Sequence, residues 1–194
     1  PKELVRSLLQ LRLEALRTQG QVLPATLRRE AEAAVERFPD DASMLAVLRD
    51  LAESDGREDE ALQWQEKITK HAPPATSVGE RQRFVDGLVA AGRRALEAGE
   101  LDACKKLSKR LQKADPDGAS AKLLLGDMHR RAGDFRQSVR EYGSTRSPAG
   151  LDRIAELLTE NPAAVEPREL LASCPIKGVL LLVARELARA GEYD

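Results

Sequence analysis

The residues best suited to nucleophilic, acid–base or metal chemistry are two histidines and two cysteines, which are scattered along the sequence. His71 lies just before Pro73 at an expected helix end, and His129 takes an aromatic position inside another expected helix. Neither has a paired nucleophile, so we expect both to be structural. Cys104 and Cys174 have no neighbouring cysteine or histidine, which argues against a CxxC redox motif or a zinc knuckle. We expect Cys104 to be a small buried apolar residue.

Sequence motifs for catalysis are missing from the chain. Carboxylates are abundant, but they are spread along expected helix faces and form no recognisable acid/base pair. The sequence has no phosphate-binding glycine loop, no dinucleotide fingerprint and no HExxH motif. We therefore expect a protein without enzymatic activity, cofactor or metal.

Two features leave an alternative open. Trp64, the only tryptophan, could stack on a ligand or pack between helices, and its helical spacing favours packing. One basic helix face could bind phosphate groups or simply be solvated, and the second interpretation is the usual one in a charge-balanced chain. That face carries Lys105, Lys106, Lys109, Arg110 and Lys113.

The charge balance narrows the classes of partner. With 31 basic and 32 acidic residues the formal net charge is -1, which gives no basic field for nucleic acid or an acidic membrane surface. No apolar run is long enough to span a membrane and no signal peptide is recognisable. We expect a soluble, cytoplasmic chain with no membrane insertion. Because it begins without Met and stops inside a recognisable repeat, we expect a fragment, with any membrane attachment supplied by a segment outside it.

Four glycines set the phase of the chain. Gly92 and Gly99 are followed by Gly126 and Gly133, each after 34 residues. An apolar helical run precedes the second glycine of each pair, and an acidic residue, an apolar residue and a further helical run follow it. A period of 34 built from helix, turn and helix is typical of a tetratricopeptide array. We expect the first glycine to admit a neighbouring helix closely and the second to end the first helix.

This phase predicts an all-α fold, an α-solenoid of tandem helix-turn-helix repeats wound into a right-handed superhelix. Upstream, Gly56 takes the helix-ending position, and nine residues are inserted between the first two clear repeats as a loop or a longer first helix. We expect one array, 1–194. Its predicted parts are a degenerate repeat (1–41), three repeats (42–75, 85–118, 119–152), an off-phase helical insert (153–176) and the first helix of a truncated repeat (177–194).

The residues Gly92, Gly99, Pro116, Gly126, Gly133, Phe135 and Tyr142 resemble the tetratricopeptide repeat (TPR) family. The resemblance covers most of 42–152 and also 177–194. Members of that family are typically scaffolds that bind other proteins without catalysis, so it implies a protein or peptide partner. The family's carboxylate-clamp branch relies on asparagines and lysines in the groove. The only asparagine here is Asn161, outside the repeats, which disfavours that branch.

In such repeats, five positions of the first helix tend to face a concave groove. The charges at these positions grade from acidic near the N-terminus to arginine-rich near the C-terminus. The arginines could hold carboxylates of an acidic partner in bidentate contacts, or local acids such as Asp127 could neutralise them. The predicted partner-binding residues are Arg93, Asp127, Arg130, Arg131, Arg185 and Arg189.

A narrower resemblance joins the run 114–142, the irregular insert after it and the run 178–194. Together they are similar to the middle of the bacterial lipopolysaccharide assembly protein B family. That family has an N-terminal membrane anchor, a cytoplasmic repeat array and a C-terminal rubredoxin-type module, and it helps a membrane protease control the deacetylase of lipid A synthesis. The resemblance implies a bacterial adaptor that regulates this synthesis. The alternative is a structural module that forms a homo-oligomer, because the unpaired helix at 177–194 would leave an apolar face to cover.

Overall fold

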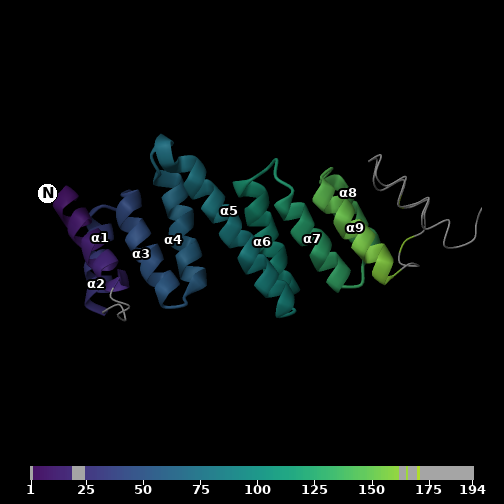
Figure 1. Ribbon diagram of the computed structural model, residues 1–194, viewed down its shortest axis with the longest axis horizontal. Helices are drawn as coiled ribbons and strands as arrows, with labels where there is room; N and C mark the ends of the chain where they lie inside the picture. The colour runs from purple at the N-terminus through teal and green to yellow at the C-terminus, as the bar shows by residue number, and fades with distance from the viewer. Residues whose placement is uncertain (1, 19–24, 162–164, 166–169, 171–194) are drawn as a thin grey trace, which may run out of the picture. The chain divides into compact units, whose positions relative to one another are not determined.

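The computed structural model describes residues 2–18, 25–161, 165 and 170 (Figure 1). Within these residues it contains α-helices and no strand, so the all-α prediction is confirmed. Neighbouring helices along the chain pack on one another, most extensively α3 on α4 and α7 on α8. The helices are α1 (Lys2–Thr18), α2 (Ala25–Arg37), α3 (Ala42–Ser54), α4 (Glu58–His71), α5 (Pro74–Glu97), α6 (Leu101–Ala114), α7 (Ser120–Arg131), α8 (Phe135–Ser144) and α9 (Pro148–Glu160).

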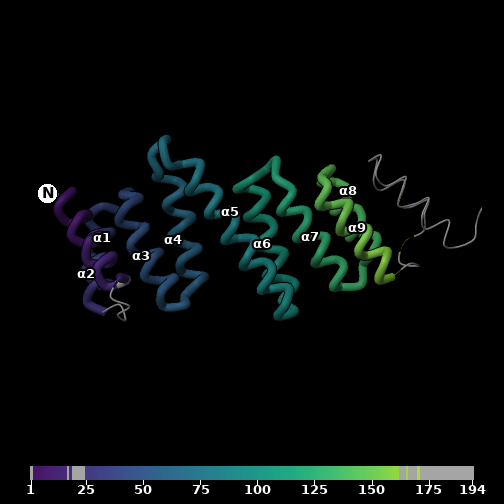
Figure 2. The backbone as a smooth tube through the Cα atoms, viewed as in Figure 1, coloured from purple at the N-terminus to yellow at the C-terminus, as the bar shows by residue number. Residues whose placement is uncertain are grey.

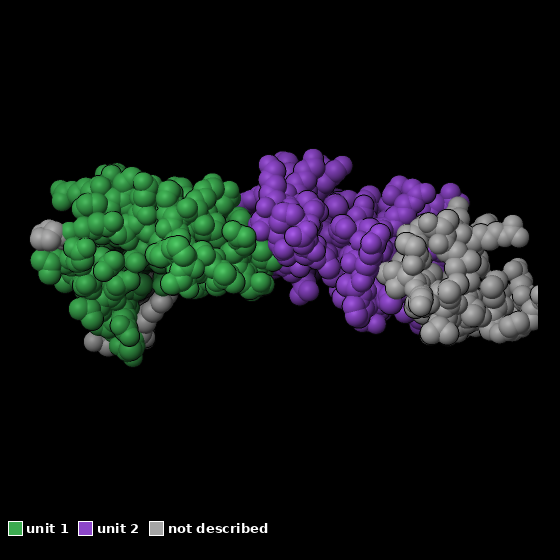
Figure 3. All heavy atoms as spheres, turned by 90° about the horizontal axis from the view of Figure 1, so that it is seen from above, with its two compact units in different colours: residues 1–87 green, residues 88–194 purple. Residues whose placement is uncertain are grey.

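The chain divides into two compact units, which Figure 3 shows in different colours. Unit 1 comprises Pro1–Gly87 and unit 2 comprises Leu88–Asp194. The division falls inside α5, which continues without a break from one unit into the other. The repeat boundaries and the handedness of the superhelix stay predictions.

Several expected helices appear at or near their predicted positions. The amphipathic segment 2–18 is α1, and α2 follows it up to Arg37. The nine inserted residues belong to α5, so the longer first helix is the correct one of the two alternatives. The described part of the expected insert at 153–176 is helical up to Glu160, but its helix, α9, begins earlier than expected, at Pro148, after the capping residue Ser147. The expected helix at 177–194 lies outside the described residues.

Three glycines end first helices in the left-handed backbone conformation. The φ angles of Gly56, Gly99 and Gly133 are 70°, 77° and 78°. Side chains other than glycine adopt this conformation at a cost, which explains why glycine recurs directly after α3, α5 and α7. The prediction that these glycines terminate helices is confirmed.

The N-terminus of α3 is fixed by Asp41, whose carboxylate accepts hydrogen bonds from the backbone N–H groups of Ser43 at 3.0 Å and Met44 at 3.2 Å. Lys2 of α1 forms an ion pair with the same carboxylate at 2.9 Å. Burial alone would raise the pKa of Asp41, but these hydrogen bonds and the Lys2 charge lower it below its ordinary value. One capping residue therefore ties α1 to the start of α3.

The apolar core of unit 1 lies where α1, α2 and α3 meet. Leu27 and Ala31 of α2 and Met44 of α3 are completely buried there. Trp64 of α4 packs against this core and remains partly exposed. Its indole N–H donates to Glu60 at 3.2 Å, and Lys67 lies 4.2 Å from the ring centroid. The packing role that its spacing favoured is therefore confirmed.

The apolar core of unit 2 lies between α7, α8 and α9, which follow one another along the tube in Figure 2. Tyr142 of α8 and Ile154 and Leu157 of α9 are completely buried in it. Gly126 of α7 faces the Tyr142 ring, and a Cβ atom at Gly126 would approach the ring to 2.3 Å. The absence of a side chain at Gly126 thus lets the ring lie directly on α7.

Candidate functional site

The described members of the predicted partner-binding set all lie in unit 2. Arg93 is on α5, and Asp127, Arg130 and Arg131 are on α7. Their surroundings differ, because α9 contributes charges that pair with some of them. Arg185 and Arg189 lie outside the described residues.

Arg130 is neutralised by two carboxylates of α9. Its guanidinium lies 3.5 Å from Glu156 and also donates a hydrogen bond to Glu160. Burial alone would lower the pKa of Arg130, but the hydrogen bond and charge of Glu160 outweigh it and raise the pKa. For this arginine the structure supports the alternative in which local acids take up the charge.

Asp127 is also engaged within unit 2. The Tyr142 hydroxyl donates to it at 2.7 Å, and the guanidinium of Arg153 lies 3.7 Å away. Burial and then the hydrogen bond to Asp127 raise the pKa of Tyr142, so the phenol stays protonated and can donate. Asp127 therefore pairs with Arg153 of α9 rather than with its neighbour Arg130. We call these residues the α7–α9 cluster: Asp127, Arg130, Tyr142, Arg153, Glu156 and Glu160.

Arg93 and Arg131 keep most of their donors available. Arg131 is exposed, and its one hydrogen bond to a described residue, at 3.3 Å, is to the backbone carbonyl of Glu97 in the last turn of α5. Arg93 lies one turn before Glu97 and is exposed, with no hydrogen bond or ion pair to any residue that the structure describes. The contact between Arg131 and α5 thus brings the Arg131 guanidinium to the last turn of the helix that carries Arg93.

Sequence reasoning missed the α9 half of the cluster, because it placed that segment in an off-phase insert. Arg153, Glu156 and Glu160 are spaced by three and four residues, so they share one helix face. Arg153 and Glu156 also pair with each other at 3.1 Å. The sequence shows that charged stripe. It does not show that the stripe pairs with Asp127 and Arg130 of α7, because this depends on how α9 packs in unit 2.

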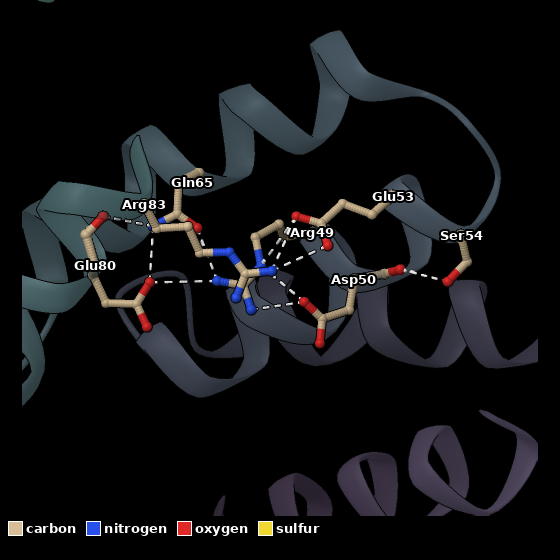
Figure 4. A network of polar contacts seen from close by, with 7 residues as sticks. All are labelled: Arg49, Asp50, Glu53, Ser54, Gln65, Glu80 and Arg83. Carbon is tan, nitrogen blue, oxygen red and sulfur yellow. Dashed lines mark hydrogen bonds and ion pairs between the residues drawn. The ribbon is translucent and has the colours of Figure 1, made fainter. Parts of the chain in front are cut away.

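Unit 1 contains a second polar network, shown in Figure 4. Arg49 of α3 is 5% exposed and donates to Asp50 and to Gln65 of α4, both at 2.8 Å. Its guanidinium also lies 3.4 Å from Glu80 of α5, which in turn accepts the Gln65 amide at 2.8 Å. The buried charge is therefore satisfied by groups from three helices.

A more exposed ion pair reinforces the contact between α3 and α5. Arg83 of α5 donates to both carboxylate oxygens of Glu53 on α3, at 3.2 and 3.1 Å (Figure 4). In each unit, then, charged side chains join first helices from successive hairpins, α3 to α5 and α7 to α9. Such pairs fix how the helices lie but leave few of their charges for a partner.

The remaining candidate residues occupy structural positions. His71 lies 3.5 Å from Asp40, and His129 lies 3.9 Å from Asp134. Cys104 is completely buried, as expected, and Cys174 lies outside the described residues. On the basic face of α6 the lysines at 105, 106, 109 and 113 are exposed, as expected for a solvated face, and Arg110 is partly exposed.

The described residues contain neither a group of three side chains that could hold a metal ion nor a helix that is long and apolar enough to cross a membrane.

No protein-family model matches the chain, and no curated protein matches it significantly. Among solved structures, the chain is similar to MamA at 15% identity, over 93% of this chain and 97% of that one, with a TM-score of 0.46. A double mutant described as MamA RS-1 ArsTM gives 12% identity, 98% coverage of both chains and a TM-score of 0.47. A thermophilic TPR protein of Thermus thermophilus gives 18% identity, 97% and 100% coverage and a TM-score of 0.37.

Proposed function

We propose that the chain is a non-enzymatic interaction module that binds an acidic segment of a partner protein through Arg93 and Arg131. The observation that carries this proposal is the pair of exposed guanidinium groups near the end of α5, one anchored to α5 and one open. Guanidinium groups bind carboxylates in bidentate contacts, which gives orientation as well as affinity.

The neighbouring α7–α9 cluster has a supporting part in this proposal. Arg130 and Arg153 are held by carboxylates within unit 2, so a partner would have to displace an existing pair to reach them. Arg93 and Arg131 require no such exchange. The proposal therefore rests on Arg93 and Arg131 among the described members of the predicted set, and in it Asp127 and Arg130 hold α7 against its neighbours.

Affinity capture from an extract of the source organism tests the proposal. The double variant Arg93→Glu/Arg131→Glu should lose the proteins that the unaltered chain captures, because two carboxylates would repel an acidic segment. A matched control, Lys105→Glu/Lys109→Glu, changes the same charge on the exposed face of α6 and should retain them. Capture should also weaken with added salt. Equal recovery by the Arg93/Arg131 variant and the unaltered chain would contradict the proposal.

A narrower form of this proposal is an adaptor similar to lipopolysaccharide assembly protein B, regulating lipid A synthesis. It is supported by the resemblance at 114–142 and 178–194 alone. Its test is whether the captured proteins include a membrane protease or the deacetylase of lipid A synthesis. Self-association through 177–194 rests on a segment outside the described residues and stays a prediction.

A further inference from the structure

The outer surface of α1 exposes apolar side chains. Leu4, Leu8 and Leu11 are 67%, 57% and 64% exposed, and they are spaced by four and three residues along one stripe of the helix. The opposite side of α1 carries Leu9 and Leu13, which are buried in the core of unit 1. The core of unit 1 is filled without Leu4, Leu8 and Leu11, so these three side chains are free to pack against another molecule.

A groove between α1 and α2 continues this stripe. It has a volume of about 340 Å³, and its lining includes Leu8 of α1 and Phe38 after α2. On the α2 side the lining consists of Glu30, Ala33, Ala34 and Arg37. We call this surface the α1–α2 face: Leu4, Leu8, Leu11, Glu30, Ala33, Ala34 and Arg37.

The α2 residues of this face are arranged symmetrically about the midpoint between Ala33 and Ala34. An acidic residue, Glu30, lies three residues before the alanine pair, and a basic residue, Arg37, lies three residues after it. If a second α2 ran antiparallel across the first, each Glu30 would meet an Arg37, and the exposed Ala33 of each copy would lie near the centre. This sequence is therefore complementary to itself in the antiparallel direction.

The exposed leucines of α1 are also arranged symmetrically, about a midpoint that lies beside the midpoint of the α2 residues. Its outer members, Leu4 and Leu11, lie on either side of a midpoint between residues 7 and 8. Two contacts show which parts of the helices lie side by side: Arg12 donates to Glu30, and Lys2 lies 5.7 Å from the Phe38 ring centroid. Halfway between these contacts are residue 7 of α1 and residue 34 of α2. A single two-fold axis at this level would serve both helices.

We propose that the α1–α2 face binds a second copy of the same chain about this two-fold axis, forming a homodimer. Leu4 then packs near Leu11 of the other copy, and Glu30 pairs with the other copy's Arg37. Such an interface uses the same surface on both chains, as two-fold dimers do. This dimer does not depend on the proposed binding of an acidic partner by unit 2.

Charge favours a second copy over an unrelated apolar helix. Arg37 is exposed and has no ion pair with any described residue, and it lies at the edge of the groove. A complementary partner must place an acid at that end and, at the other end, a base beside Glu30, whose carboxylate also accepts a hydrogen bond from Arg12. A second copy does both by symmetry, and the small Ala33, which is exposed, lets the two α2 helices approach closely.

Sedimentation of the chain over a range of concentrations, with charge-reversal variants mixed in pairs, tests the proposal. The unaltered chain should show a concentration-dependent dimer. Glu30→Arg alone faces arginine with arginine, and Arg37→Glu alone faces glutamate with glutamate, so each should lose the dimer. An equimolar mixture of the two variants should restore it, because every contact across the axis then joins opposite charges.

Leu8→Glu should also abolish the dimer, whereas Val78→Glu, at an 80% exposed position of α5, should leave it intact. Circular dichroism checks that each variant remains helical. A monomer at every concentration, a dimer that survives Leu8→Glu, or a mixture that fails to form a dimer would each overturn the proposal. Capture of a partner through Arg93 and Arg131 could still succeed in any of these cases.

Discussion

At the scale of single residues, the contact between Gly126 and Tyr142 predicts an effect of known sign. A Cβ at position 126 would lie 2.3 Å from a ring that is completely buried and hydrogen-bonded to Asp127, so the ring has no easy way to move. We expect Gly126→Ala to lower the free energy of unfolding by about 1–3 kcal/mol, the usual cost of overpacking. Urea denaturation measures this.

The matched control for this substitution is Gly79→Ala in α5, where no atom lies within 4 Å of the new Cβ. There the only change is the higher helix propensity of alanine, which should stabilise the chain by up to about 1 kcal/mol. If both substitutions changed stability in the same direction, the steric account of Gly126 would be wrong.

The buried thiol of Cys104 predicts a dependence on pH. Burial, helped by the charge of Asp127, raises the pKa of Cys104 to about 11. The folded chain therefore keeps the thiol proton where the unfolded chain has lost it, above about pH 8.5. The contribution of this proton to stability is complete below that pH and disappears as the pH rises towards 11.

Urea denaturation at pH 8 and pH 10.5 tests this expectation with the variant Cys104→Ala. The variant should lose less stability between the two pH values than the unaltered chain does. Tyr142, whose pKa is also raised, remains in both proteins and should cause the alkaline loss that they share. An identical loss in both proteins would show that the Cys104 thiol contributes nothing.

At the scale of helices, Arg49 is the buried link among α3, α4 and α5. Removing the guanidinium leaves the buried Gln65 side-chain oxygen without its Arg49 donor and removes the positive charge that lies beside Glu80. We expect Arg49→Ala to cost about 3 kcal/mol of unfolding free energy, as for breaking a buried pair by removal of one partner. The control Arg83→Ala removes an exposed pair with Glu53 and should cost less than about 1 kcal/mol. Equal losses would contradict the importance of burial.

How far the sequence predicted these elements depended on whether the signal was local. The period of 34 predicted the helices and the glycines that end them, because a left-handed residue after a helix is a local requirement. The pairing of Arg130 with Glu156 and Glu160 could not be predicted, because it depends on which face of α9 packs on α8. Arg49 was overlooked for a similar reason: its partners come from two other helices.

At the scale of the whole molecule, contacts run mainly between helices that are neighbours along the chain. The effect of a core substitution should therefore stay near its own hairpin. We expect Leu157→Ala, at a completely buried position, to cost about 2–5 kcal/mol. Hydrogen exchange should become faster in α8 and α9 and stay unchanged in α3 and α4. Faster exchange throughout the chain would indicate that the units unfold together.

The repeat position of Gly126 recurs at Gly92 and Arg49, and the space beside it is filled in a different way each time. At the position 34 residues earlier, Gly92 makes room for Leu124 of α7, and 43 residues before that, Arg49 fills the space with its own side chain and bonds to Gln65. The α3–α4 and α7–α8 hairpins therefore fill this space from one of their own two helices, whereas the space beside Gly92 is filled by Leu124 of the next hairpin. Recombination that paired α3 with α8 would place Arg49 against Tyr142, and the two side chains would overfill the space between the helices. Pairing α7 with α4 would place Gly126 against Gln65 and leave a gap there. For α3–α4 and α7–α8, the unit that evolution can duplicate or exchange is thus the complete hairpin, whereas α5–α6 also needs the small residue at position 92 to fit Leu124 of the hairpin that follows.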